Sequence, residues 1–123
     1  MIPGFTADVL LGSRVVLLSI EDFVPRDLVS EANERLVSLM GKQCQYLIVD
    51  CSRMTEISSK GVGLVAYQAA ELRRKGGEVL LIPPSPPVAK RLGIATLHKI
   101  TRFFPSVEEA VNYARAALGT VAD

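Results

Sequence analysis

The chain has 123 residues, of which 49% are hydrophobic and 22% are charged, and this composition predicts one compact domain spanning residues 1–123. Fourteen basic and thirteen acidic residues give a net charge of +1, so no overall field favours nucleic acid or an anionic membrane as a partner. The start of the chain lacks a signal sequence, and no apolar run approaches the roughly 20 residues that cross a bilayer, so we expect a cytoplasmic protein without a membrane segment.

The N-terminal third predicts a hairpin followed by a helix. Residues 5–11 and 14–20 have the pattern of two strands joined by a two-residue turn. The second strand is apolar on both faces, which indicates a position inside the sheet. A helix is expected to begin near Pro25 and to end at Gly41 as a left-handed cap. Its expected apolar stripe consists of Leu28, Val29, Ala32, Leu36, Leu39 and Met40.

The middle of the chain predicts two buried strands with a helix between them. Tyr46–Asp50 and Glu78–Ile82 are short apolar runs typical of strands covered on both faces. Residues 61–75 have helical periodicity and stop at a Gly-Gly pair. Arg73, Arg74 and Lys75 lie at the end of this helix, where cations either complement the helix dipole or form a binding patch. The inward face is expected to be Val62, Val65, Ala66, Ala69 and Leu72.

The last third predicts a short helix, an edge strand and a final helix. A proline-rich loop leads into a helix over residues 88–92, capped by Ser85, and residues 100–104 have the pattern of an edge strand. Ser106 and Glu109 form a capping box at the start of the last helix. Its expected inward face is Val107, Ala110, Val111, Ala114 and Leu118.

The order of elements is therefore ββαβαβαβα. Strands that alternate with helices after the hairpin imply parallel neighbours with right-handed crossovers. The expected fold class is α/β, with a mixed, mostly parallel β-sheet and about four helices in a single domain.

The two cysteines predict no disulfide and no metal site. Cys44 and Cys51 lie at the two ends of one predicted strand. At ~3.3 Å per residue of extended chain their Cα atoms are ~20 Å apart, which is beyond the reach of a disulfide. Neither has a second cysteine or a histidine at metal-ligand spacing. We expect two reduced structural thiols, with no metal and no cofactor.

Residues 47–64 are the most informative segment of the chain. An apolar strand ends at Asp50, a polar loop follows, and Ser58-Ser59 precedes two glycines at the start of a helix. Helix N-termini expose unpaired N–H groups and partial positive charge, so they suit an anion or a switch. Asp50 is either a ligand-facing residue at the carboxyl end of a central strand or a turn former that accepts backbone hydrogen bonds. One of the two serines is expected to cap the helix, which leaves the other exposed to modification.

Lys60 conflicts with the local electrostatics. It falls in the first helical turn, where a positive charge opposes the helix dipole. Three interpretations are open: the side chain extends into solvent, it pairs with Glu56 or another acid, or it presents a fixed cation to a partner.

No residue set predicts catalysis. His98 has no serine or cysteine partner at the spacing of a catalytic triad, so a loop or surface position is expected. Gly61 and Gly63 lack both the third glycine of a dinucleotide fingerprint and the Gly-Lys-Ser/Thr of a P-loop. Nothing in the spacing of Asp50 and Glu56 supports general acid–base chemistry. We therefore expect a protein that is not an enzyme.

The element order and residues 47–64 resemble the STAS family, the domain of anti-sigma-factor antagonists and of sulfate-transporter tails. The Asp-x-Ser that ends the family's third strand is matched by Asp50-Cys51-Ser52. The family's Asp-Ser-Ser/Thr-Gly-x-Gly motif is matched by the segment from Ser58 to Gly63, with Ser58 in place of the aspartate. The Gly-Gly pair before the fourth strand, Leu92-Gly93 and residues 103–110 also fit the family pattern.

The resemblance implies a regulatory binding module that docks to an anti-sigma factor or to a serine kinase of the histidine-kinase-like type. The implied docking surface is the loop before the second helix and that helix's N-terminus. Its residues, by their match to the family motif, are Asp50, Ser52, Ser58, Ser59, Lys60, Gly61, Val62 and Gly63.

The resemblance also predicts an altered switch. In the family, a partner kinase phosphorylates the last Ser or Thr before the first motif glycine, and here Lys60 stands at that position. Phosphorylation at this position is therefore not expected, and Ser59 or Ser58 is the alternative acceptor. Two alternative functions remain open: the STAS domain of an anion transporter, and a small-ligand or nucleotide-binding module that uses the free N–H groups near Gly61.

Overall fold

The computed structural model describes residues 5–20, 27, 29–54, 59–91 and 93–119. These residues form a five-stranded sheet with the spatial order β1-β2-β3-β4-β5. β1 and β2 are antiparallel, and every later neighbouring pair is parallel. The expected α/β class with a mixed, mostly parallel sheet is confirmed. The strands are β1 (Phe5–Leu10), β2 (Val15–Ile20), β3 (Tyr46–Asp50), β4 (Glu78–Ile82) and β5 (Arg102–Phe103).

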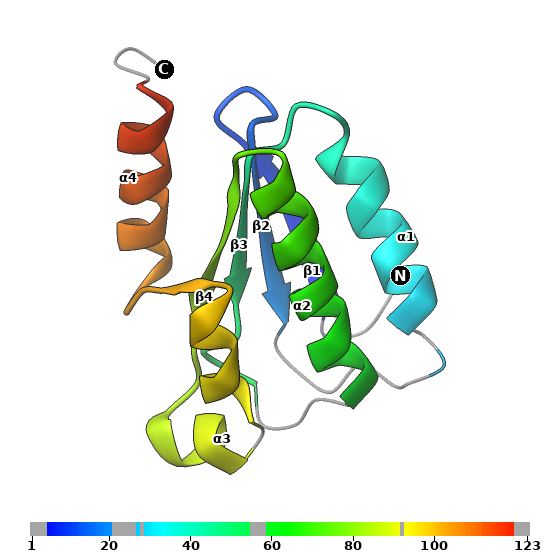
Figure 1. Cartoon of the computed structure of the whole chain (residues 1–123), viewed down its shortest axis with the longest axis vertical. Helices are drawn as coiled ribbons and strands as arrows, with labels where there is room; N and C mark the ends of the chain where they lie inside the picture. The colour runs from blue at the N-terminus through cyan, green and yellow to red at the C-terminus, as the bar shows by residue number, and fades with distance from the viewer. Residues whose placement is uncertain (1–4, 21–26, 28, 55–58, 92, 120–123) are drawn as a thin grey trace.

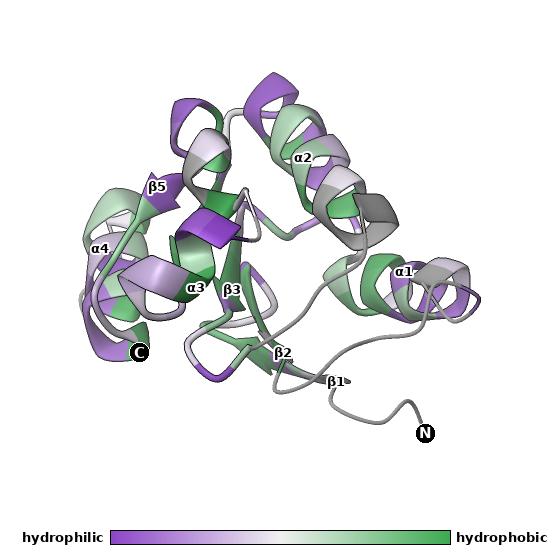
Figure 2. Cartoon of the chain, turned by 90° about the horizontal axis from the view of Figure 1, so that it is seen from below, coloured by the Kyte–Doolittle hydropathy of each residue, from purple (hydrophilic) through white to green (hydrophobic). Residues whose placement is uncertain are grey.

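Helices cover both faces of this sheet. α1 and α2 lie on one face and α4 lies on the other (Figure 1 and Figure 2). α3 and a 3-10 helix, η2, connect β4 to β5. In the described part of the chain the helices are α1 (Val29–Met40), α2 (Ser59–Arg74), α3 (Pro86–Arg91), η2 (Ile94–Lys99) and α4 (Val107–Leu118).

The sheet separates two hydrophobic clusters. Because successive strand residues point to opposite faces, one apolar strand supplies both clusters. In β3, Leu47 and Val49 join the cluster beneath α1 and α2, whereas Tyr46 and Ile48 join the one beneath α4. This explains why the predicted central strands are apolar throughout rather than alternating. α4 contributes the buried residues Ala110 and Ala114.

The β1–β2 connection is longer than predicted. Leu10 pairs with Val15, so residues 11–14 form a four-residue loop, and the expected two-residue turn is wrong. Leu11, Gly12 and Ser13 all have positive φ angles, of 48°, 66° and 72°. Three successive residues in this region reverse the chain over a longer path than a Gly-first hairpin turn requires.

The helix α1 buries a narrower stripe than predicted. Ala32, Leu36 and Met40 are buried, whereas Leu39 is 41% exposed. A step of four residues from Leu36 leads to Met40, and Leu39 falls beside the stripe. The left-handed cap at Gly41 is confirmed by its φ of 58°. The expected start at Pro25 and the expected inward Leu28 lie outside the described residues.

The helix α2 begins and ends close to its predicted limits. It starts at Ser59 and stops at Arg74, before Gly76 with a φ of 87°. Val65, Ala69 and Leu72 are buried as predicted, and Ala66 packs partly buried against the same cluster.

The segment after β4 differs most from the sequence-based expectation. α3 begins at Pro86, two residues before the predicted start, and residues 94–99 form the unpredicted helix η2. The predicted strand over residues 100–104 shrinks to two residues. The cap of α4 is confirmed, since the Ser106 hydroxyl accepts a hydrogen bond from the Glu109 N–H at 3.2 Å.

Candidate functional site

The candidate site begins at the carboxyl end of β3, where Asp50 starts a turn. One Asp50 oxygen, Oδ1, accepts hydrogen bonds from the Ser52 backbone N–H at 3.0 Å and from the Ser52 hydroxyl at 2.7 Å. The interpretation of Asp50 as a turn former that accepts a backbone hydrogen bond is confirmed. The two residues of the Asp-x-Ser pattern therefore form one fixed polar pair, with Ser52 exposed and Asp50 partly buried.

Two buried side chains anchor this turn to the core. Cys51 is 2% exposed and Met54 is 1% exposed. The Cys51 N–H donates to the Ile82 carbonyl oxygen at 2.8 Å, and the Met54 N–H donates to the Cys51 carbonyl oxygen at 2.9 Å. The first bond extends the pairing of β3 with β4 by one residue, so the loop leaves the sheet in a defined direction.

The thiol within the turn is not a nucleophile at neutral pH. Burial, with a further contribution from the nearby Asp50 carboxylate, raises the pKa of Cys51 to about 12. Near pH 7 the thiol is therefore neutral, and only a thiolate attacks or binds metal readily. Cys51 and Cys44 are both free and buried, as the sequence predicted.

A cavity of about 300 Å³ adjoins the Asp50 turn. Its lining includes Ser19 and Ile20 from β2, together with Arg53, which the sequence analysis did not select. Ser19 pairs with Asp50 in the parallel β2–β3 register, so the carboxyl ends of both strands meet at this edge. The signal that identifies the β2 residues is the predicted parallel pairing of these two strands. The residues around Asp50 do not themselves indicate that Ser19 and Ile20 line this cavity.

The motif glycines and Lys60 belong to the start of α2. The helix begins at Ser59, which places the backbone of Lys60, Gly61 and Val62 in its first turn. Ser58 and Glu56 lie outside the described residues, as do the side chains of residues 59–62. The expected serine cap and the three interpretations of Lys60 therefore stay predictions.

Gly63 leaves bare backbone on the surface of α2. The residue is exposed, and a Cβ built on it would have no atom of the described residues within 4 Å. It is not among the described glycines with positive φ. A glycine in a helix costs ~1 kcal/mol relative to alanine. Neither backbone conformation nor packing within the described part of the chain requires glycine here.

The part of the chain that the structure describes contains neither a metal-ligand cluster nor a membrane-spanning helix. Among the described residues, no three His, Cys, Asp or Glu side chains lie together as metal ligands would. No helix in the described ranges combines the length and apolar character needed to cross a membrane. His98 is exposed at the end of η2 and lines a different cavity, on the β5 side of the sheet.

Comparisons with known proteins agree with this geometry. A family model described as the STAS domain matches residues 13–110. The chain is 25% identical over 75 residues to an anti-sigma F factor antagonist from Paenibacillus polymyxa. That match covers 61% of this chain and spans 62% of the length of the Paenibacillus protein.

Solved structures share the fold over most of the described chain. The anti-sigma factor antagonist SpoIIAA in its unphosphorylated form aligns with a TM-score of 0.76 at 23% identity, covering 96% of this chain and 99% of its own. The murine Solute Carrier 26 family member A9 anion transporter, in its inward-facing state, aligns with a TM-score of 0.63 at 18% identity. This second match covers 84% of the present chain and 18% of the transporter. At these identities the likeness concerns the fold.

Proposed function

Because the chain belongs to the STAS domain family through its residues 13–110, we propose that it is a regulatory binding module of the anti-sigma factor antagonist type. The proposed partner is an anti-sigma factor or a serine kinase of the histidine-kinase-like type, and the proposed site of action is the cytoplasm. Similarity to an anti-sigma F factor antagonist supports this class of partner. We assign the chain no catalytic step.

The proposed docking surface joins the turn after β3 to the first turns of α2. The observation that carries the proposal is the exposed Gly63, which the described part of the chain does not itself require. A bare helical turn lets a partner backbone approach α2 closely, and the adjoining polar turn offers hydrogen-bond groups at its rim. The proposed surface consists of Asp50, Ser52, Ser58, Ser59, Lys60, Gly61, Val62 and Gly63.

A large side chain introduced at Gly63 tests the proposed docking surface. We expect Gly63→Trp to weaken binding to a purified anti-sigma factor from the same organism by at least about 100-fold, because interface centres are closely packed. Isothermal titration calorimetry measures the change. Ala70→Trp is the matched control, because Ala70 is also exposed and lies two turns further along the same face of α2. Equal affinity of both tryptophan variants and the unmodified chain would contradict the proposed surface.

The proposed regulation differs from the family's at one position. Lys60 occupies the place of the usual phosphate acceptor, so we propose that phosphorylation does not switch the chain there. Lys60→Ser supplies an acceptor hydroxyl at the same backbone position of α2. After incubation with the partner kinase and ATP, we expect one phosphate on this variant and none at position 60 of the unmodified chain.

Intact-mass spectrometry with peptide mapping reads out this experiment, and Lys60→Ala is the control. Phosphate on Ser58 or Ser59 of the unmodified chain would assign the switch to one of these alternative acceptors. A Lys60→Ser variant that the kinase leaves unmodified would contradict the match of position 60 to the family's acceptor.

The fold shared with the murine anion transporter supports one other candidate function. A STAS domain attached to a transporter is encoded downstream of a long series of membrane-spanning helices. The coding sequence around this chain therefore discriminates between the two candidates. A membrane domain in the same reading frame would favour the transporter, and a neighbouring serine-kinase gene would favour the regulatory module.

A further inference from the structure

A second cavity lies at the end of the sheet opposite the Asp50 turn. Its volume is about 320 Å³, and its lining consists of Arg14, Lys42, Gln43, Cys44, Gln45 and Lys75. These residues come from the β1–β2 turn, the α1–β3 loop and the α2–β4 connection. Figure 1 shows these three connections meeting at the top of the molecule, whereas α2 begins at the bottom. The cavity is therefore separate from the proposed docking surface.

The lining of this cavity is rich in positive charge. Arg14, Lys42 and Lys75 contribute three cations, and none of the described residues that line the cavity carries a carboxylate. Among the described residues, none of these three side chains forms an ion pair. Glu71, on the last turns of α2, forms its ion pair with Arg74 and interacts with Lys75 only through longer-range electrostatics.

Two weaker sources of negative charge do not cancel the three cations. Burial raises the pKa of the Cys44 thiol to about 11, so near pH 7 it is neutral. α1 and α2 both end near this cavity, and a helix C-terminus carries about half a negative charge. Two such termini supply about one negative unit against three positive ones, so an excess of about two units remains. The amides of Gln43 and Gln45 add neutral hydrogen-bond donors.

The backbone holds the three cation-bearing segments in one arrangement. The Arg14 carbonyl oxygen accepts from the Gln45 N–H at 2.8 Å and from the Tyr46 N–H at 3.2 Å. The Gln45 carbonyl oxygen in turn accepts from the Glu78 N–H at 3.0 Å. Gly77 packs so closely that a Cβ there would lie 1.8 Å from the Gln45 oxygen. A preformed backbone lowers the entropy cost of gathering these cations around a ligand.

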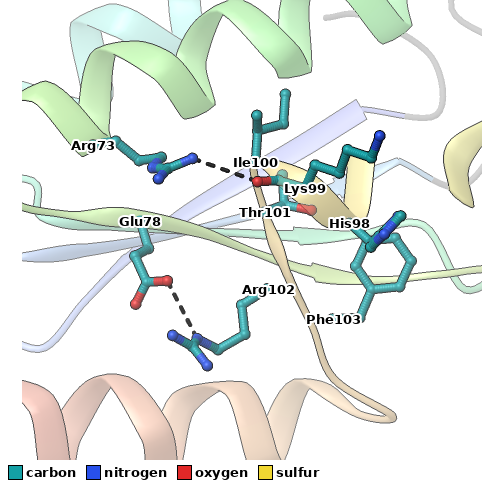
Figure 3. Close-up of a pocket in the computed structure, with 8 residues that line it drawn as sticks. All are labelled: Arg73, Glu78, His98, Lys99, Ile100, Thr101, Arg102 and Phe103. Atoms are coloured by element: carbon teal, nitrogen blue, oxygen red, sulfur yellow. Dashed lines mark hydrogen bonds and ion pairs between the residues drawn. The ribbon is translucent and has the colours of Figure 1, made fainter. Parts of the chain in front are cut away.

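A neighbouring cavity also has a basic lining, but its lining includes a carboxylate. This cavity, of about 390 Å³, lies beside β5 and contains Arg73, Lys99 and Arg102 together with Glu78 (Figure 3). Arg102 pairs with Glu78 at 3.2 Å, and its guanidinium lies 4.9 Å from the centre of the Tyr113 ring. Arg73 donates to the Lys99 carbonyl oxygen at 3.5 Å. Both arginines are thus engaged within the protein, whereas Arg14, Lys42 and Lys75 form no ion pair among the described residues.

We propose that the cavity lined by Arg14, Lys42 and Lys75 binds a small phosphate-bearing anion. A phosphate group carries about two negative charges at neutral pH, which matches the excess positive charge of the lining. An arginine fork can bind two phosphate oxygens at once, and the ammonium groups add point charges. The volume is near the lower limit of about 300 Å³ for small-ligand sites, which suits a compact ligand.

Titration of the full chain with inorganic pyrophosphate tests this site. Calorimetry at constant ionic strength should give saturable binding of one pyrophosphate. Arg14→Gln, Lys42→Gln and Lys75→Gln should each weaken it by at least about tenfold, as expected for the loss of one charge-assisted hydrogen bond. Arg73→Gln is the matched control, since Arg73 lies in the last turn of α2, two residues before Lys75, but lines the cavity beside β5. It should bind pyrophosphate like the unmodified chain.

Further ligands distinguish the sources of the phosphate. Equal affinity for ATP and pyrophosphate assigns the site to free phosphates, and tighter binding of ATP assigns it to nucleotides; both results support the proposal. Absence of saturable binding, equal affinity for citrate and pyrophosphate, or an equal loss in Arg73→Gln would overturn it. The cavity variants should retain full affinity for the protein partner, so this test is independent of the docking proposal.

Discussion

Two glycines of this chain have opposite structural roles. Gly77 faces the backbone of Gln45, where a Cβ would lie 1.8 Å from the carbonyl oxygen, whereas a Cβ at Gly63 would meet none of the described residues within 4 Å. Close backbone approach is a structural reason for a glycine, because no side chain can relieve the clash by moving. Open space gives no such reason. The fold therefore requires glycine at position 77, whereas Gly63 is an exposed glycine that the described structure does not require.

Replacement of each glycine by alanine should separate these roles. We expect Gly77→Ala to lower the free energy of unfolding by about 2–3 kcal/mol, because the backbone around Gln45 must shift to admit a methyl group. Gly63→Ala should raise it by up to about 1 kcal/mol, through better helix propensity at an exposed position. Urea denaturation followed by circular dichroism measures both changes. Equal stability of the two variants would contradict the close contact at Gly77.

At the residue scale, the sequence predicts some residues of the candidate site and not others. Asp50 and Ser52 lie two residues apart in the chain, and their hydrogen bonds are local, so a local pattern identifies both. Ser19 and Ile20 line the same cavity from a strand that lies thirty residues earlier. Their place depends on strand order and register, which a local motif does not encode.

At the scale of elements, the limits of a strand are predicted accurately where turn-forming residues stand next to it in the sequence. β3 and β4 have the predicted limits because Asp50 begins a side-chain-bonded turn and a Gly-Gly pair precedes β4. η2 has no such sequence signal. It is stabilised by side-chain hydrogen bonds to the backbone, from Thr96 to the Gly93 oxygen at 2.7 Å and from Thr101 to the Leu97 oxygen at 2.8 Å. The second bond holds Thr101 against η2, directly before β5 begins at Arg102.

The N-terminus of α4 offers an element-scale test. Ser106 is its N-cap, and the Ser106 hydroxyl accepts the Glu109 N–H. We expect Ser106→Ala to lower the free energy of unfolding by about 1 kcal/mol, because this N–H loses its partner. Ser106→Asp keeps an acceptor at the same position and should preserve stability. Thermal and urea denaturation give the comparison, and an alanine variant as stable as the aspartate variant would contradict the cap.

At the scale of the whole molecule, the sheet divides the core and both cysteines lie in the larger half. Cys44 and Cys51 belong to the cluster under α1 and α2. Burial raises the pKa of Cys44 from 9.0 to about 11 and that of Cys51 from 9.0 to about 12. The folded state therefore keeps both thiols protonated at pH values where the unfolded chain ionises them.

This difference predicts a loss of stability in alkaline solution. Folded pKa values above the unfolded value stabilise the fold fully below pH 9.0, and this contribution is lost as pH rises toward 11 and 12. The free energy of unfolding should fall by up to about 1.4 kcal/mol per pH unit for each thiol in that window. Urea midpoints between pH 8 and 10.5 measure the slope. Cys51→Ala should have lower stability but a shallower slope, and parallel curves for variant and unmodified chain would contradict the prediction.

The edge strand β1 affects how two copies of the chain can associate. β1 has six residues and pairs within the described sheet only with β2, so its other side is a row of hydrogen-bonding groups onto which another strand can add. Asp8 is exposed near the middle of that strand. A second copy adding in antiparallel register about this residue would bring two carboxylates face to face, and such pairs repel. One aspartate thus discourages the edge-to-edge pairing of two copies through β1, a protection that the two-residue β5 achieves by being short.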